Sequence, residues 1–258
     1  MACRVRPALA DMPRFKLTIE YDGTPFVGWQ RQENGPSVQQ AIEEAAAAYC
    51  QTEIVVHGAG RTDAGVHAKA QVAHVDLPRD DGGDKVRDAL NAHLRPSPIA
   101  IVQAEQVSEE FHARFSAIKR HYLYRIVMRR APLALDIKRA WWLTKPLDAE
   151  AMSQAARVLI GKHDFTSFRA TECQAKTPVK TIDAITVTQS GDEIEVSVKA
   201  LSFLHHQVRN IVGTLSLVGE GKWTEGEVAK ALAEKDRSAG GPTAPAHGLY
   251  LTEVRYPA

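Results

Sequence analysis

Short segments of alternating apolar and polar residues are interleaved with longer segments of helical pattern along the whole chain. In the first segment Phe15, Leu17, Ile19 and Tyr21 alternate with polar residues, which is typical of a half-buried β-strand. The same reasoning predicts strands at residues 54–56, 70–76, 99–107, 121–128, 182–188, 193–199 and 249–255. Helices are predicted from a cap at Ser37 to about Cys50, and at 85–94, 148–160, 203–218 and 224–234.

The order of these segments favours an α+β fold, because strands and helices do not alternate strictly. We expect two similar α/β halves whose strands share a mixed, mostly antiparallel central sheet, with helices packed on it. The 258 residues divide into a predicted disordered tail at 1–12, an N-terminal half at 13–115 and a C-terminal half at 116–258. Residues 235–247, rich in Gly, Ala and Pro, predict a mobile loop.

The composition excludes several classes of protein. The longest apolar runs are far shorter than the roughly 20 residues of a membrane-spanning helix. Cys3, Cys50 and Cys173 are widely spaced, which argues against a disulfide framework or a structural zinc site and fits a reducing cytoplasm. The first eleven residues lack the apolar stretch of a signal peptide, and Met12 is a hypothetical natural start.

The net charge of +1 hides a strongly basic stretch between Phe111 and Lys145. Nine cations and a single acid, Asp136, give these 35 residues a net charge of +8 and leave −7 for the remainder. A basic surface with interleaved aromatic rings favours a nucleic-acid partner, and a solvated basic hairpin is the alternative. The cations are Arg114, Lys119, Arg120, Arg125, Arg129, Arg130, Lys138, Arg139 and Lys145, and the aromatic residues are Phe115, Tyr122, Tyr124, Trp141 and Trp142.

A glycine-rich loop at residues 58–65 joins two predicted strands and carries one carboxylate, Asp63. Its glycines allow a ligand to approach the backbone closely. A dinucleotide-binding fingerprint would need a glycine in place of Asp63 and a helix after the loop, so cofactor phosphate binding is not expected. The pattern alone leaves two interpretations of Asp63, a catalytic carboxylate or a residue that caps a turn.

Arg209 lies in a predicted apolar helix with Val208, Ile211, Val212 and Leu215. A cation in such surroundings is expected to pair with a buried anion, because an unpaired buried charge is costly. The neighbouring His205 and His206 point in different directions on a helix, and no third residue at useful spacing completes a zinc site.

Tyr122 and Tyr124 lie on one face of a predicted strand, and His121, Leu123 and Arg125 lie on the other. The first face offers aromatic rings to a ligand. Packing of both tyrosines in the core of a sheet is an equally good interpretation of the spacing.

Seven blocks of sequence, in this order and spanning nearly the whole chain from Phe15, resemble the bacterial tRNA pseudouridine synthase A (TruA) family. Of these, the third is highly specific by itself. The blocks are Tyr21-Asp22-Gly23, Gly28-Trp29-Gln30-Arg31-Gln32, Gly60-Arg61-Thr62-Asp63-Ala64-Gly65-Val66-His67, Phe111-His112-Ala113-Arg114-Phe115-Ser116-Ala117, Asp164-Phe165-Thr166-Ser167-Phe168-Arg169, Val208-Arg209-Asn210-Ile211-Val212-Gly213 and Gly248-Leu249-Tyr250-Leu251.

The resemblance implies an isomerase that converts uridine to pseudouridine at positions 38, 39 and 40 in the anticodon stem-loop of tRNA. It implies an RNA-binding cleft between the two halves, a homodimer, and no metal or organic cofactor.

The resemblance also implies roles for individual residues. Asp63 matches the catalytic aspartate and Arg209 the basic residue paired with it. Tyr122 matches the tyrosine that stacks on the target base, and Arg61 an arginine that assists base extrusion. Leu249, or Leu251, would help to wall the pocket.

Two other functions fit parts of the sequence. A non-catalytic RNA-binding or chaperone protein would use the basic, aromatic stretch and leave Asp63 as a turn residue. A nucleoside or sugar hydrolase usually needs two carboxylates around the scissile bond, and the sequence near Asp63 offers no obvious second one.

Overall fold

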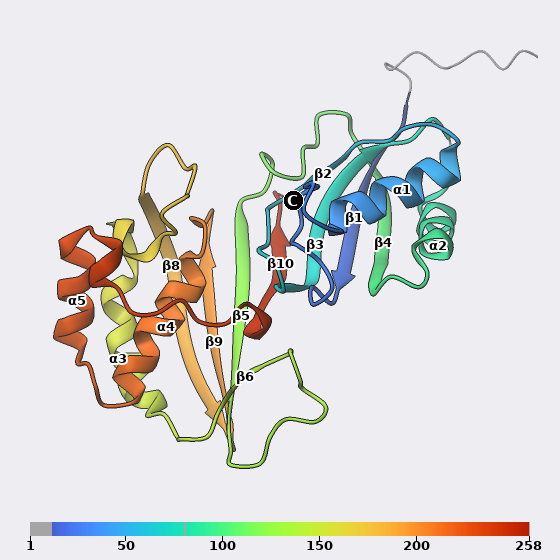
Figure 1. The fold of residues 1–258 in the computed structure, drawn as a ribbon. Helices are drawn as coiled ribbons and strands as arrows, with labels where there is room; N and C mark the ends of the chain where they lie inside the picture. The colour runs from blue at the N-terminus through green and yellow to red at the C-terminus, as the bar shows by residue number, and fades with distance from the viewer. Residues whose placement is uncertain (1–11, 80, 258) are drawn as a thin grey trace, which may run out of the picture. The chain divides into compact units, whose positions relative to one another are not determined.

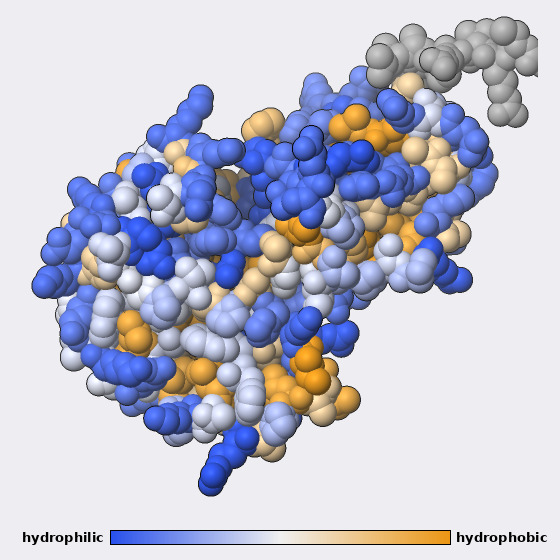
Figure 2. Space-filling model, in the orientation of Figure 1, coloured by the Kyte–Doolittle hydropathy of each residue, from blue (hydrophilic) through white to orange (hydrophobic). Residues whose placement is uncertain are grey.

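The computed structural model describes residues 12–79 and 81–257, and its contacts divide the chain into two compact units (Figure 1). The N-terminal unit runs to Ala117 and includes Tyr256, and the C-terminal unit is Ile118–Arg255. Hydrophilic residues cover most of the visible face, and hydrophobic residues show in scattered patches (Figure 2). The predicted tail at 1–12 lies, apart from Met12, outside the described residues.

The N-terminal unit is an antiparallel sheet with two helices on one of its faces (Figure 1). Its main strands lie in the order β4-β1-β3, and β2 pairs with β3. In β1 the predicted alternation is confirmed, since Phe15, Leu17 and Ile19 are fully buried. Helix α1 begins at the predicted cap, where the Ser37 hydroxyl accepts a hydrogen bond from the Gln40 amide. The elements are β1 (Arg14–Tyr21), α1 (Val38–Cys50), β2 (Val56–Gly58), β3 (His67–Asp76), α2 (Gly83–Leu94) and β4 (Ile99–Val107).

The strands of the C-terminal unit lie in the order β10-β5-β9-β8-β7. These strands pair antiparallel, whereas β6 pairs parallel with β5, so the sheet is mixed. Helix α3 packs on β8 and α4, and most residues of α4 are buried. Both units therefore confirm the α+β class. The elements are β5 (Lys119–Met128), β6 (Trp141–Leu143), α3 (Ala149–Ala156), β7 (Gly161–Asp164), β8 (Val179–Ser190), β9 (Glu193–Ala200), α4 (Gln207–Gly219), α5 (Glu225–Glu234) and β10 (Leu249–Arg255).

Helix α4 differs from its predicted bounds, because it begins at Gln207 and not near Phe203. His206 adopts a left-handed conformation with φ of 61°, which a helix interior does not accommodate. The Gln207 side chain also accepts a hydrogen bond from the Leu204 amide at 2.8 Å, which closes a turn before the helix. The apolar pattern thus extends beyond the helix itself.

The segment 235–247, predicted to be a mobile loop, is instead tied to α4. Asn210 Oδ1 accepts hydrogen bonds from the Thr243 hydroxyl at 2.7 Å and from the Arg237 guanidinium at 3.2 Å. Gly241 donates to the Thr214 hydroxyl at 3.0 Å. Composition was misleading here because the partners of the segment lie on a helix far earlier in the chain.

The described ranges contain no helix long and apolar enough to cross a membrane.

Gly213 is a point of close approach between α4 and this segment. A Cβ added at Gly213 would lie 1.8 Å from the Pro242 carbonyl oxygen, which is backbone and cannot move aside freely. We predict that Gly213→Ala lowers the free energy of unfolding by about 1–3 kcal/mol, as overpacking of a close contact does. Chemical denaturation measures this change.

Gly226→Ala is the matched control in helix α5, because its added Cβ would meet nothing closer than the Thr224 hydroxyl at 3.7 Å. We expect this variant to be neutral or slightly stabilised, since alanine favours helix over glycine by about 1 kcal/mol. Equal stability of the two variants would contradict the close packing at Gly213.

Candidate active site

The loop that carries Asp63 is fixed by backbone pairing with the segment that follows β1. Asp63 forms an isolated antiparallel bridge with Gly28, and the Trp29 amide donates to the Thr62 carbonyl at 3.0 Å. Gly28 has φ of +120°, and a Cβ there would lie 2.7 Å from the Thr62 carbonyl oxygen. Only glycine therefore allows the two segments to come this close.

Buried side chains support the same loop from below. The hydroxyls of Tyr21 and Thr62 lie 2.7 Å apart, and burial raises the pKa of Tyr21 well above its usual value, so the phenol stays protonated. The Gln71 side chain donates to the Gly60 carbonyl at 2.9 Å. These contacts hold the backbone on either side of Arg61, which is exposed, and place Asp63 at intermediate exposure.

The other end of the loop turns sharply after Asp63. The Val66 amide donates to the Asp63 carbonyl at 3.1 Å, and Gly65 has φ of +77°. Gly23 packs so tightly here that a Cβ would lie 2.0 Å from the Val66 carbonyl oxygen, and its amide donates to Nδ1 of buried His67 at 3.1 Å. The supporting roles of Tyr21 and His67 were not predicted from the sequence, although both residues stand inside the quoted blocks.

The second carboxylate near this loop is Asp22, and it has a local role. Its Oδ1 accepts a hydrogen bond from the Thr24 amide at 2.9 Å and lies 3.2 Å from His67 Nδ1. This is the geometry of a carboxylate that stabilises the turn after β1.

In the C-terminal unit, Tyr122 lies in the middle of β5, opposite Leu251 of β10 and Val198 of β9. Its ring is 9% exposed and meets the Phe203 ring edge-on, with centroids 5.1 Å apart at 89°. Leu249 is 5% exposed and lies opposite Tyr124.

Tyr124, which was predicted to share a face with Tyr122, belongs to the core. It is fully buried, and its hydroxyl donates to the Pro245 carbonyl at 2.7 Å. Burial raises the pKa of Tyr124, and the charge of Arg209 opposes that rise. For Tyr124 the core interpretation is therefore the correct one.

Arg209 is held at the start of α4 by the segment that crosses it. Its Nε donates to the Ala244 carbonyl at 2.8 Å, and the Ala244 amide donates to the Arg209 carbonyl at 3.1 Å. The adjacent Asn210 fixes Arg237 and Thr243 of the same segment. Contacts within the C-terminal unit therefore help to fix the position of the Arg209 guanidinium.

The basic stretch is not a single polyanion-binding face. Arg125 pairs with Glu193 and Asp136, and the hydrogen bond with Glu193 is the main cause of its raised pKa. Arg120 is buried and donates to the Leu201 carbonyl at 2.6 Å. These two arginines are engaged in contacts within the C-terminal unit. Fewer cations of the basic stretch therefore remain for a ligand than the sequence count suggests.

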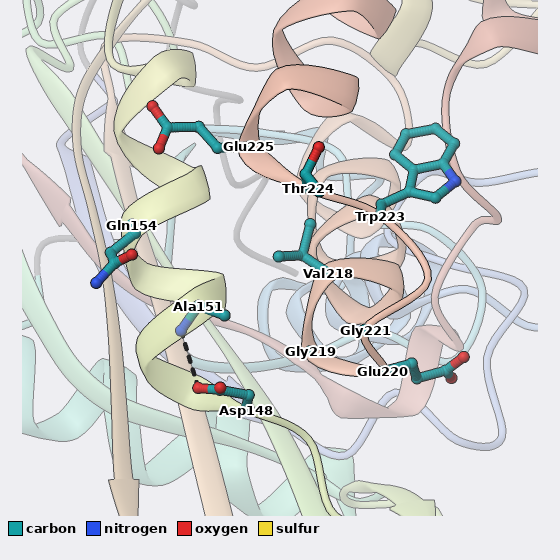
Figure 3. A pocket seen from close by; sticks show the side chains of 10 residues that line it. All are labelled: Asp148, Ala151, Gln154, Val218, Gly219, Glu220, Gly221, Trp223, Thr224 and Glu225. Carbon is teal, nitrogen blue, oxygen red and sulfur yellow. Dashed lines mark hydrogen bonds between the residues drawn. The ribbon is translucent and has the colours of Figure 1, made fainter.

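A shallow hollow in the C-terminal unit lies between α3, the end of α4 and the start of α5, and it contains none of the predicted site residues (Figure 3). Three carboxylates, of Asp148, Glu220 and Glu225, line it. Asp148 accepts a hydrogen bond from the Ala151 amide at 2.9 Å and so caps α3. This acidic lining disfavours RNA phosphates.

The comparisons with known proteins decide the family. The family model described as tRNA pseudouridine synthase matches residues 17–116 and 155–257. The chain belongs to the tRNA pseudouridine synthase family. As a family member it is an isomerase that acts on tRNA.

Similar curated relatives in this family match almost end to end. The chain is 63% identical to tRNA pseudouridine synthase A of Paramagnetospirillum magneticum, over 96% of each chain. It is 62% identical to tRNA pseudouridine synthase A of Parvibaculum lavamentivorans, over 95% of this chain and 100% of the relative. A solved structure titled "Crystal Structure of a Cbf5-Nop10-Gar1 Complex" matches at 12% identity with a TM-score of 0.31, covering 96% of this chain and 60% of that one.

The predicted site residues of this family member divide between the two units. Arg61 and Asp63 belong to the N-terminal unit, and Tyr122, Arg209 and Leu249 belong to the C-terminal unit. Their meeting in one pocket stays a prediction.

The bridge at Gly28 gives a direct test of how the Asp63 loop is positioned. We predict that Gly28→Ala lowers the rate of pseudouridine formation at least tenfold, because the added Cβ and the left-handed φ both oppose the pairing with the Asp63 loop. Single-turnover assays on unmodified tRNA measure the rate.

Gly60→Ala is the control in the loop itself, since its added Cβ would meet nothing within 4 Å. We expect it to keep a near-normal rate. An unchanged rate in Gly28→Ala would show that the bridge does not position Asp63.

Proposed function

We propose that this family member isomerises uridine to pseudouridine at positions 38, 39 and 40 of the anticodon stem-loop, with Asp63 as the essential carboxylate. The observation that carries the proposal is the rigid, glycine-dependent loop that fixes Asp63 and no other acid. A residue that merely capped a turn would not need support on both sides. The positions in tRNA come from the sequence resemblance.

The chemistry of the reaction suits a single carboxylate. The C–N glycosidic bond of uridine breaks, the uracil turns, and a C–C bond forms between C5 of the base and the same sugar. The proton on C5 then leaves and N1, now free of the sugar, gains one, so that the product is an isomer of uridine. No oxidant or second substrate is consumed. An ionised Asp63 acts either as a nucleophile or as a base that begins an elimination.

Arg209 is the residue that we propose keeps this carboxylate ionised. A nearby opposite charge favours the charged form of an acid. The anchoring of its Nε on the Ala244 carbonyl supports this role, because it fixes the position of the guanidinium.

The target uridine must leave the base stack before it can react, which costs a few kcal/mol and least in loops. We propose that Tyr122 stacks on the flipped base, which returns about 1–3 kcal/mol, and that Arg61 helps to extrude it. The edge-on contact with Phe203 holds the Tyr122 ring in one orientation, and the exposure of Arg61 leaves it accessible to RNA. Leu249 would form part of the pocket wall.

The same proposal includes a homodimer in the cytoplasm, with one tRNA contacting both subunits. Its support is the resemblance of the sequence blocks. A hydrolase is disfavoured because Asp22, the neighbouring acid, is engaged in a turn.

Asp63→Asn tests the proposal most simply. We predict that it lowers pseudouridine formation at positions 38, 39 and 40 by at least about 1,000-fold, because the amide cannot act as nucleophile or base. The affinity for tRNA should change little, because Asn has nearly the same size. Pseudouridine mapping and filter binding on the same tRNA measure the two effects.

The wild-type chain separates the rival functions in the same experiment. Binding of tRNA without product in the wild type would favour the non-catalytic RNA-binding protein. Product in both proteins at the same rate would remove Asp63 from the mechanism.

A further inference from the structure

Phe115 is an exposed aromatic residue in a block of sequence that the proposed chemistry does not use. Its side chain is 76% exposed, whereas Tyr124 of the same basic stretch is fully buried. Nearby Phe111 also has a partner, since its ring lies 4.9 Å from that of Tyr256. The N-terminal unit thus presents one large ring to its surroundings at this place.

Below Phe115 the rings of three histidines form a continuous column. His57 and His74 stack with centroids 4.9 Å apart at 21°, and His74 meets His112 edge-on, with centroids 4.6 Å apart at 62°. His112 in turn lies 4.4 Å from the Phe115 ring at 36°. The column begins on β2 and β3 and ends at the exposed ring of Phe115, so we call these four residues the ring column.

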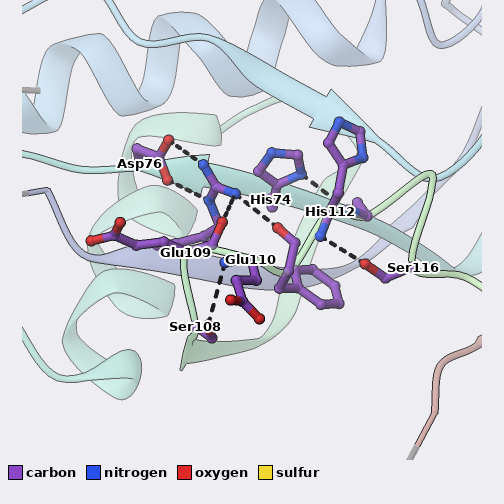
Figure 4. A network of polar contacts seen from close by, with 10 residues as sticks. His74, Asp76, Ser108, Glu109, Glu110, His112 and Ser116 are labelled. Carbon is purple, nitrogen blue, oxygen red and sulfur yellow. Dashed lines mark hydrogen bonds and ion pairs between the residues drawn. The ribbon is translucent and has the colours of Figure 1, made fainter. Parts of the chain in front are cut away.

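Hydrogen bonds hold two members of the ring column, His74 and His112, in place (Figure 4). His74 Nδ1 accepts from the Ala113 amide at 3.1 Å, and His112 Nδ1 accepts from the Arg114 amide at 3.1 Å and the Phe115 amide at 3.3 Å. The His112 amide donates to the Ser116 hydroxyl at 3.0 Å. The turn that presents Phe115 is therefore fixed before any ligand binds.

The same contacts keep two of the imidazoles neutral. A ring nitrogen that accepts from a backbone amide carries no proton, and both Nδ1 atoms do so. Burial lowers the pKa of His74 to about 4, assisted by the charges of Arg14, His57 and His112 against Asp76. Burial also lowers the pKa of His112, and electrostatic interactions with His57, Arg14 and Arg114 lower it further. At neutral pH the rings next to Phe115 are flat and uncharged.

The charge beside Phe115 is positive. The guanidinium carbon of Arg114 lies 5.8 Å from the centroid of the Phe115 ring. In Figure 4, Glu109 lies toward Asp76, at the opposite end of the network from His112 and Ser116. A planar ring with a cation beside it matches a nucleotide, whose base is planar and whose phosphate is an anion.

We propose that Phe115 is a stacking platform for an unpaired base of the tRNA substrate, with Arg114 facing the adjoining phosphate. The inference rests on the proposed action on tRNA. It concerns a second nucleotide contact, on the N-terminal unit, separate from the base that Tyr122 is proposed to bind. Stacking on an aromatic ring does not distinguish one base from another, so this platform would bind an exposed base of any identity.

The test compares three variants at position 115. We expect Phe115→Ala and Phe115→Leu to raise both the Kd for full-length tRNA and the KM about tenfold, the size of effect that loss of one stacked base produces. Phe115→Trp should bind as well as the wild type or better, since it keeps an aromatic face. The value of kcat should stay nearly constant in all three, because Phe115 does not touch the reacting atoms.

Val102→Ala is the control for loss of an exposed apolar side chain. Val102 is 53% exposed on β4, at the edge of the sheet away from β2. It should bind tRNA like the wild type. Thermal denaturation should give similar Tm values for all four variants, because neither side chain is in the core.

Three results would overturn the inference. Wild-type affinity in Phe115→Ala would show that no base stacks there. Wild-type affinity in Phe115→Leu would show that the contact is merely apolar. A change of mass in size-exclusion chromatography without tRNA would make Phe115 part of a protein interface. Absence of pseudouridine in the wild type would instead defeat the proposed function, while the binding comparison would still test the platform.

Discussion

The backbone pairing between Gly28 and Asp63 is the constraint on which the proposed chemistry depends. A carboxylate in an exposed loop would sample many positions, and a nucleophile or base must be held within a fraction of an ångström of its target. Here three glycines allow the approach, because Cβ atoms at Gly23, Gly28 and Gly58 would each lie within 3 Å of a neighbouring segment. At Gly58 the neighbour is the indole of buried Trp29. The three sequence blocks around these glycines are therefore one structural unit that presents Asp63.

The C-terminal unit holds a cation, Arg209, in a fixed position in a similar way. Arg209 is fixed because the segment 235–247 crosses α4 at Gly213 and is fastened there by Asn210. The same crossing brings the Ala244 carbonyl to the guanidinium. In each unit a glycine allows two segments of the chain to touch: Gly28 in the N-terminal unit and Gly213 in the C-terminal unit. The functional residue near that contact is thereby held in a defined position. Position, and not residue type alone, distinguishes Asp63 and Arg209 from the many other acids and cations of the chain.

The sequence predicted the elements whose apolar pattern is regular and local. Strand β10 was predicted with its observed bounds, and α1 with the cap that starts it, because alternation and capping involve only neighbouring residues. The predicted start of α4 was wrong, because apolar residues before His206 continue the helical pattern beyond the helix. No local signal could show that Glu193, far along the chain on another strand, neutralises Arg125. The supporting role of His67 also depends on a distant backbone amide, that of Gly23.

The central claim is that Asp63 meets the sugar or the base of a flipped uridine. A crystal structure of the wild-type chain with an anticodon stem-loop bound would measure this directly, through the distance from an Asp63 carboxylate oxygen to C1′ of the sugar or C6 of the base. We predict an oxygen within about 3–3.5 Å of one of these carbons, the separation of a reactive complex. A carboxylate turned toward solvent, with another acid closer to the target nucleotide, would contradict the account.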